Sequence, residues 1–338
     1  MLELVGVRHR YGGRVVLDLE RFEVPPGALI AMVGPNGSGK STLLRLLALL
    51  EQPTEGEVRL DGRPVSGGPA RASPNAAARQ RVTLVEQRPI LLRGTVRANL
   101  GYGLRVRGMR RTEVNRVTED VAARLGVTPL LERHRHELSE GEVQRVAVAR
   151  ALAVDPAVLL LDEPVSSADR AAAQTLYGAL AQERRRRPLA ICLASHQLED
   201  AYRWADDVRA LAEGKLSPVT PENLFRVDLP NTGAGDLKHI RVGTIEIAAM
   251  TDRAGPAILA VAPSDIFVSR APLTSSARNV FAGRVTRLAR QRPGAVHVTA
   301  DVGVELIAVV TEEAARDLQL APGGPVVFAF KASAVRVF

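Results

Sequence analysis

Hydrophobic and polar positions divide the chain into two parts with different patterns. The first part, residues 1–216, alternates short apolar runs at residues 28–33, 158–161 and 189–194 with longer segments of helical period. Short continuous apolar runs are typical of buried strands, and their alternation with helices is typical of α/β folds. The pattern therefore predicts an α/β domain over residues 1–216.

The pattern changes after residues 217–223, a stretch with two prolines that we interpret as a linker. From residue 224 to residue 338, short Val-, Thr- and Ile-rich segments are separated by Pro and Gly, which predicts a β-rich accessory domain. We expect one short helix near residues 312–318. The expected strands are residues 240–247, 257–261, 266–269, 283–288, 295–301, 304–310 and 325–331.

The most specific motif joins the first of these apolar runs, which ends at Val33, to a helical segment. It fits the phosphate-binding pattern G-x-x-x-x-G-K-[ST]. Glycines let the backbone approach phosphate oxygens, and successive N–H groups with the helix N-terminus form an anion nest. Lys40 would reach the β and γ oxygens, and the Ser41 hydroxyl would ligate Mg²⁺. The residues expected to hold a nucleotide are Gly34, Pro35, Asn36, Gly37, Ser38, Gly39, Lys40, Ser41 and Thr42.

Composition limits the other possibilities. A length of 338 residues suggests two or three domains, and Cys192 is the single cysteine, so neither a disulfide framework nor a cysteine-based metal site is expected. The apolar runs are shorter than the ~18 residues that span a bilayer, and the N-terminus lacks a signal-like pattern. The net charge of +8 could attract nucleic acid, but only 4% of the residues are aromatic, so we expect no nucleic-acid partner. We expect a cytoplasmic protein.

Two carboxylates follow the apolar run at residues 158–161. Asp162 would leave a buried strand beside the phosphate loop, where it can hold Mg²⁺ through water. Glu163 would then be placed to polarise an attacking water as a general base. A strand followed by an acidic turn is common in proteins. The Asp162–Glu163 pair therefore indicates a catalytic site only in combination with the phosphate loop.

A second helix start precedes the helical segment 143–153. Ser139 and Glu142 have the spacing of a capping box, so we expect Ser139 at the N-cap. That interpretation is sufficient by itself. A helix N-terminus that carries a serine and Gly141 nevertheless also offers a second anion-binding pole.

Gln87 and His196 each follow a strand-like segment, and either would be an ordinary surface or core residue if it stood alone. Taken in chain order with the phosphate loop, residues 138–142 and the Asp162–Glu163 pair, they resemble the motifs of ABC transporter ATP-binding subunits. The resemblance covers residues 1–216. It implies a P-loop NTPase fold that binds ATP and Mg²⁺.

The resemblance also implies roles for single residues. Tyr11 is similar to the family's aromatic residue that stacks on adenine, and Asp169 ends a segment similar to the D-loop. Gln87 would act as the Q-loop residue near Mg²⁺, and His196 as the switch histidine. Both would work with Glu163 in the catalytic set.

The family pairs two such domains head to tail, so Ser139 and Gly141 of one chain would contact ATP held by a second copy. The resemblance implies a homodimer bound to an integral-membrane permease at the cytoplasmic face of the cell membrane, served indirectly by a solute-binding protein. Residues 88–137 would form a mostly helical insertion that contacts the permease. One departure is Glu140, where the family usually has glycine. We expect Glu140 to point outward, because a carboxylate facing the γ-phosphate would be repulsive, and to affect rate more than binding.

Residues 275–285 and 330–335 resemble the Mop/TOBE-type, OB-like β domains of molybdate and tungstate importer ATPases, which would begin here near residue 272. In that family these segments help to bind an oxyanion, and hydroxyls, an amide and cations suit a tetrahedral dianion. A simple strand start with a solvated lysine remains the alternative. The expected oxyanion-binding residues are Ser276, Arg278, Asn279, Lys331 and Ser333.

Together these features predict the ATP-hydrolysing subunit of a molybdate or tungstate importer, since residues 91–95 and 195–202 also resemble tungstate-type members. An importer ATPase for sulfate, sugar, polyamine or iron is the first alternative, because related β tails occur there. A non-transport ABC ATPase of translation or DNA repair is less favoured, since those commonly carry two cassettes or a coiled-coil insertion. A nucleotide-switch module without transport is the third alternative. It is disfavoured because such a module would lack the motif at residues 139–142 and His196, which this chain has.

Overall fold

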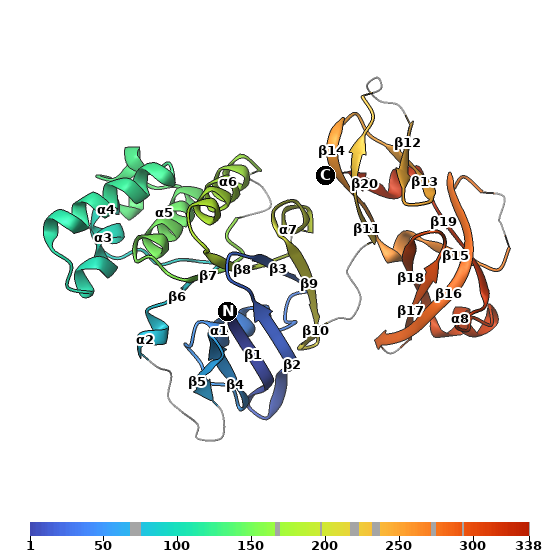
Figure 1. Ribbon diagram of the computed structural model, residues 1–338, viewed down its shortest axis with the longest axis horizontal. Helices are drawn as coiled ribbons and strands as arrows, with labels where there is room; N and C mark the ends of the chain where they lie inside the picture. The colour runs from blue at the N-terminus through green and yellow to red at the C-terminus, as the bar shows by residue number, and fades with distance from the viewer. Residues whose placement is uncertain are drawn as a thin grey trace. The chain divides into compact units, whose positions relative to one another are not determined.

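The chain forms two compact units, Met1–Leu216 and Ser217–Phe338, each with its own hydrophobic core (Figure 1). The residues that this computed structural model describes are 1–67, 76–165, 170–196, 198–216, 223–231, 237–271, 275–292 and 294–337.

A mainly parallel sheet lies at the centre of the first unit. Its strand order is β10-β9-β3-β8-β7-β6, and only β10 runs antiparallel to its neighbour. Every residue of β3 is buried, as expected of a parallel strand covered on both faces. The bounds are β3 Leu29–Val33, β6 Val82–Val85, β7 Val158–Asp162, β8 Ala190–Ser195, β9 Asp207–Ala212 and β10 Lys215–Leu216.

An antiparallel sheet covers one face of this parallel sheet. Its order is β2-β1-β4-β5, with bounds β1 Leu2–Tyr11, β2 Arg14–Val24, β4 Glu55–Leu60 and β5 Arg63–Gly67. Side chains of β1 and β2 share a core with Ile30 and Met32 of β3 and with the leucines of helix α1, Lys40–Leu47. Leu29, Ala31 and Val33 point into the other core, because side chains alternate across a strand.

Helices form that other core. The segment between Gln87 and α5 contains two α-helices and two 3₁₀ turns. Arg124 of α4 forms an ion pair with the buried Glu183 of α6, which ties this segment to the rest of the unit. The bounds are α2 Ala76–Arg79, α3 Val96–Val106, α4 Arg111–Arg124, η1 Thr128–Leu130, η2 Arg135–Glu137, α5 Glu140–Ala153, α6 Arg170–Arg186 and α7 Leu198–Trp204.

The second unit is built from antiparallel strands. In its described residues the sheet orders are β11-β14-β20, β12-β13 and β15-β19-β16-β17-β18. The bounds are β11 Asn223–Leu229, β12 Leu237–Val242, β13 Ile245–Met250, β14 Gly255–Val261, η3 Pro263–Asp265, β15 Phe267–Ser269, β16 Asn279–Arg292, β17 Ala295–Asp301, β18 Glu305–Thr311, α8 Glu312–Asp317, β19 Pro325–Phe330, η4 Ala332–Ala334 and β20 Val335–Val337.

Sequence patterns located most of these strands, and two expectations need correction. The strand expected at residues 240–247 is wrong: a turn at Gly243, where φ is +56°, separates β12 from β13. Apolar residues continue on both sides of that two-residue turn and hide it. The expected linker also ends too late, since Asn223 already belongs to β11; residues 217–222 lie outside the described residues.

Candidate nucleotide-binding site

The phosphate loop joins β3 to α1 and passes very close to its neighbours. At Gly34, with φ +152°, a Cβ would lie 2.1 Å from the Leu211 carbonyl oxygen. At Gly39, with φ +106°, a Cβ would lie 2.8 Å from Cδ2 of Leu17. Both the positive φ angles and the close packing therefore require glycine, and they press the loop against β9 and β2.

Lys40 begins α1 and is only 6% exposed. Its Nζ donates to the Gly34 carbonyl at 2.7 Å and to the Pro35 carbonyl at 3.0 Å. Burial lowers the pKa of Lys40, while the charges of Glu163 and Asp162 act to raise it. The ammonium is thus held over the loop, within electrostatic reach of both carboxylates.

Asp162, the last residue of β7, faces the start of α1. Burial raises the pKa of this carboxyl, and a hydrogen bond from Ser41 acts in the opposite direction. Ser41 and Asp162 therefore bring two oxygen donors together, the set that Mg²⁺ prefers when substrate phosphates and water supply its other ligands. The described residues contain no group of three or more His, Cys, Asp or Glu side chains that could hold a metal by themselves.

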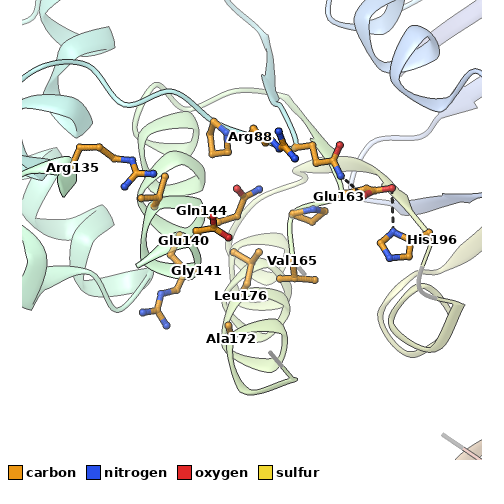
Figure 2. Close-up of a pocket in the computed structure, with 15 residues that line it drawn as sticks. Arg88, Arg135, Glu140, Gly141, Gln144, Glu163, Val165, Ala172, Leu176 and His196 are labelled. Carbon is orange, nitrogen blue, oxygen red and sulfur yellow. Dashed lines mark hydrogen bonds and ion pairs between the residues drawn. The ribbon is translucent and has the colours of Figure 1, made fainter. Parts of the chain in front are cut away.

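Three polar residues meet directly after the ends of β6, β7 and β8. Nε2 of Gln87 donates to Oε2 of Glu163 at 2.6 Å, and Nδ1 of His196 lies 3.1 Å from Oε1 (Figure 2). The backbone of Glu163 has φ +45°, and its N–H donates to the Ala194 carbonyl at 2.9 Å. Each carboxylate oxygen of Glu163 therefore has its own partner, and the side chain has a defined direction.

A cavity of about 760 Å³ contains most of the expected nucleotide-binding residues. Val16 of β2 also lines it, although the sequence analysis did not select this residue. Only its place five residues after Tyr11, on the paired strand, could have suggested it. Ser38 is 3% exposed and is not among the lining residues, so its side chain faces the protein. The lining residues are Val16, Gly34, Pro35, Asn36, Gly37, Gly39, Lys40, Ser41, Thr42, Gln87, Asp162, Glu163 and His196.

Tyr11 ends β1 and is 44% exposed. Tyr11 does not line the 760 Å³ cavity, but Thr42 does. The Tyr11 hydroxyl shares a hydrogen bond with Thr42. Tyr11 therefore lies at the rim of the site.

Ser139 is the N-cap of α5, and the predicted capping box is confirmed. The Glu142 N–H donates to the Ser139 hydroxyl at 3.3 Å, and the Ser139 N–H donates to Oε2 of Glu142 at 2.8 Å. Neither Ser139 nor Gly141 is among the residues that line the 760 Å³ cavity of their own chain.

A second cavity, of about 700 Å³, adjoins the first turn of α5 (Figure 2). Glu140, Gly141 and Gln144 line it together with Glu163 and His196. Glu140, the first residue of α5, is exposed and lines this cavity of its own chain. That it points away from the γ-phosphate stays a prediction, because the ATP concerned would be held by a second copy of the chain.

Helix α7 begins just after the switch-like His196 and packs against α6. The rings of Tyr177 and Trp204 stack with centroids 5.8 Å apart and an interplanar angle of 24°. This contact joins α6 to α7.

Residues 166–169, which include the expected site residue Asp169, lie outside the described residues.

In the second unit, the two expected oxyanion segments lie side by side, because Asn279 of β16 pairs with Phe330 of β19. Asn279 is 1% exposed, its Oδ1 accepts from the Ala248 N–H at 2.7 Å, and its Nδ2 donates to the Ala248 carbonyl at 2.9 Å. Its interpretation as a ligand is therefore corrected: its amide fastens β13 to β16. The expected residues that remain exposed are Ser276, Arg278, Lys331 and Ser333.

Comparison with known proteins agrees with this geometry. The ABC transporter family matches residues 17–166, and the TOBE domain matches residues 275–337. The molybdate/tungstate import ATP-binding protein of Pyrococcus horikoshii is 30% identical over 94% of this chain and 94% of its own. The chain belongs to the ABC transporter ATP-binding family.

This ABC importer ATPase also resembles relatives with other named solutes. The sulfate/thiosulfate import ATP-binding protein of Mycobacterium tuberculosis is 34% identical over 82% of this chain and 84% of its own. Among solved structures, cbiO1 of Clostridium perfringens, part of the ABC transporter complex cbiONQ, has a TM-score of 0.58 and 25% identity. That match covers 64% of this chain and 86% of the other.

The family membership makes the bound nucleotide ATP and the enzyme an ATPase. Its accessory domain is of the TOBE type. Within the described residues, each helix is too short or too polar to cross a lipid bilayer.

Proposed function

We propose that this importer ATPase hydrolyses Mg²⁺-bound ATP with Glu163 as the general base, to power uptake of molybdate or tungstate. The observation that carries the catalytic part is the contact of Gln87 and His196 with the two oxygens of Glu163. These three residues line the same cavity as Lys40 and Asp162, at the edge of the parallel sheet.

The phosphates would occupy the loop at the start of α1, where backbone N–H groups and Lys40 balance their charge. Mg²⁺, held by Ser41 and Asp162, would supply charge neutralisation between the phosphates. Glu163 would accept a proton from the attacking water, since a held carboxylate lets the base stay aligned. Gln87 and His196 would keep the Glu163 carboxylate in that direction, with Gln87 also near Mg²⁺.

The composite-site proposal rests on where α5 begins. Ser139 and Gly141 do not line their own phosphate-loop cavity, which supports a role on ATP held by a second copy of the chain. Asp169 is proposed to act at the same dimer contact. Tyr11, at the rim, would stack on the adenine.

The membrane partner is proposed to dock on residues 88–137. Ile90, Leu92, Tyr102 and Val106 are large apolar residues with 79%, 39%, 49% and 69% exposure. These exposed apolar side chains, all within residues 88–137, are available for contact with a protein partner. The partner would be an integral-membrane permease, which would place this subunit at the cytoplasmic face of the membrane with a solute-binding protein as an indirect partner.

The substrate proposal has two supports. A relative aligned over nearly the whole chain is named for molybdate and tungstate import. The TOBE domain also exposes two hydroxyls and two cations, on Ser276, Ser333, Arg278 and Lys331, in adjacent segments. A sulfate importer is the second candidate, because sulfate is also a tetrahedral dianion and another relative is named for it.

The decisive test is Glu163→Gln in the full chain. Loss of a positioned base should lower ATP turnover by about 10²–10⁴-fold while ATP still binds, since the phosphate loop is intact. ATP with Mg²⁺ should then trap a dimer on size-exclusion chromatography. Glu20→Gln, an exposed change on β2, serves as the matched control and should keep full turnover. Turnover near the wild-type rate for Glu163→Gln would remove Glu163 from the mechanism.

A further inference from the structure

Glu51 lies next to the hydroxyl of Tyr11, in the irregular segment that follows α1. The Tyr11 hydroxyl donates to Oε2 of Glu51. Burial and then this hydrogen bond raise the pKa of Tyr11, so the hydroxyl stays protonated and keeps its role as donor. Glu51 itself is partly buried, with 27% of its side chain exposed.

Two further side chains, those of His9 and Arg45, lie against Glu51 and Tyr11. Nε2 of His9 lies 3.3 Å from Oε2 of Glu51, and His9 is only 6% exposed. The imidazole meets the Tyr11 ring nearly at a right angle, with centroids 4.9 Å apart and an interplanar angle of 88°. Nη1 of Arg45 lies 3.8 Å from the other carboxylate oxygen of Glu51. Each oxygen of Glu51 therefore faces a partner.

This cluster reaches the nucleotide site through Thr42. The Tyr11 hydroxyl also shares a hydrogen bond with Thr42, which lines the phosphate-loop cavity. The polar end of Tyr11 is thus anchored, while 44% of the residue is exposed to solvent. An anchored ring has already lost the rotamer freedom that binding would otherwise remove, which favours ligand binding.

We propose that Glu51, supported by His9, is a positioning residue that holds the Tyr11 ring for stacking on the adenine of ATP. This inference rests on the proposed function, in which Tyr11 stacks on the base. The phosphate end of the nucleotide is bound by other residues, so Glu51 acts on the base alone.

The test compares ATP with inorganic tripolyphosphate, which has no base, as ligands of the full chain. Glu51→Ala and Tyr11→Phe should each weaken ATP binding by about 2- to 12-fold, the range expected when one side chain must be ordered on binding. KM should rise while kcat is unchanged. Tripolyphosphate binding should not change, whereas damage to the loop itself would weaken both ligands.

A double variant separates positioning from general stability. Tyr11→Phe combined with Glu51→Ala should bind ATP no more weakly than Tyr11→Phe alone, because Tyr11→Phe already removes the hydrogen bond to Glu51. Glu55→Ala, a nearby exposed glutamate on β4 that pairs with Arg8 and Arg10, is the matched control and should leave ATP affinity unchanged.

Tyr11→Ala distinguishes failure of the proposed stacking of Tyr11 on adenine from failure of the positioning role of Glu51. If Tyr11→Ala does not change ATP affinity, the stacking role and the positioning role fail together. If Tyr11→Ala weakens ATP binding but Glu51→Ala and Tyr11→Phe do not, only the role of Glu51 is overturned. Equal weakening of ATP and tripolyphosphate by Glu51→Ala would also overturn it.

Discussion

The two units of the chain use polar side chains at strand ends in opposite ways. After β6, β7 and β8, the side chains of Gln87 and His196 both contact that of Glu163, and all three line a cavity. In the second unit, Asn279 and Asn223 turn inward and bond to the backbone of neighbouring strands. Polar side chains at strand ends therefore line a candidate site in one unit and stabilise the contacts between strands in the other.

Sheet architecture explains this difference. Parallel strands end at one common edge, so side chains that follow them gather there and remain accessible. Antiparallel strands that belong to separate sheets meet with unpaired backbone groups, which must be satisfied when buried. Asn223 of β11 illustrates the second case, since it accepts from the Ile307 N–H at 2.6 Å and donates to the Ile307 carbonyl at 2.9 Å, both on β18 of another sheet.

The sharpest test of the comparison uses one lysine from each unit. Lys40→Ala should lower ATP turnover by about 10²–10³-fold, because it removes a charged donor from the developing phosphate charge. Lys331→Ala should instead weaken molybdate binding to the full chain by calorimetry, by about 10- to 150-fold for one charge-assisted bond. Lys215→Ala, an exposed lysine on β10, should do neither. Unchanged molybdate binding in Lys331→Ala would leave that residue a solvated surface lysine.

A smaller effect is expected from Asn279→Ala, and it should appear in stability rather than in catalysis. The change orphans the buried N–H and carbonyl of Ala248, at a cost of about 1–3 kcal/mol for each group. Urea unfolding should show this loss in the transition of the second unit, while ATP turnover stays the same. The exposed neighbour Arg278→Ala should shift unfolding by no more than about 0.5 kcal/mol. An equally small shift for Asn279→Ala would show that its two hydrogen bonds are dispensable.

The smallest effect concerns pH. Burial raises the folded-state pKa of Asp162 above its ordinary 3.8, so its contribution to stability is complete below that value and is lost as pH rises through the raised pKa. The unfolding free energy of the wild type, minus that of Asp162→Asn, should therefore fall as pH rises above about 4.

Asp61 provides the opposite sign for comparison. Hydrogen bonds from the N-terminal ammonium and Arg81 lower the pKa of Asp61, so its stabilising contribution is present above the ordinary value and is lost as pH falls. The same difference for Asp61→Asn should rise with pH in the window below about pH 4 and be flat above it. A difference for Asp162→Asn that is flat above about pH 4, as expected for Asp61→Asn, would mean that the burial of Asp162 has no effect on its titration.

Sequence alone located residues that the structure brings together where those residues form contiguous motifs. The phosphate loop, the Asp162–Glu163 pair and the capping box depend on local spacing, so a short window contains the information. The meeting of Gln87 with His196 around Glu163 followed from the order of motifs and the resemblance to a family. That both side chains contact one carboxylate depends on the strand order of the sheet, which no short stretch of sequence contains.

Other features depend on contacts between distant segments. Val16 lines the cavity because β2 passes beside the phosphate loop, which its local sequence does not express. Asn279 was expected to be a ligand because its segment resembles the oxyanion-binding segment of Mop/TOBE-type domains, yet its side chain bonds to Ala248, on another sheet. The turn at Gly243 was hidden because the apolar residues on both sides share one β-rich pattern.

The stacked pair Tyr177 and Trp204 has a practical consequence. The chain contains a single tryptophan, and it ends α7, the helix that follows His196. Indole emission from the whole protein therefore arises at one position, against the ring of Tyr177. Rearrangement of α7 against α6 during the ATP cycle would alter that emission, so the protein carries its own optical reporter of the segment after His196.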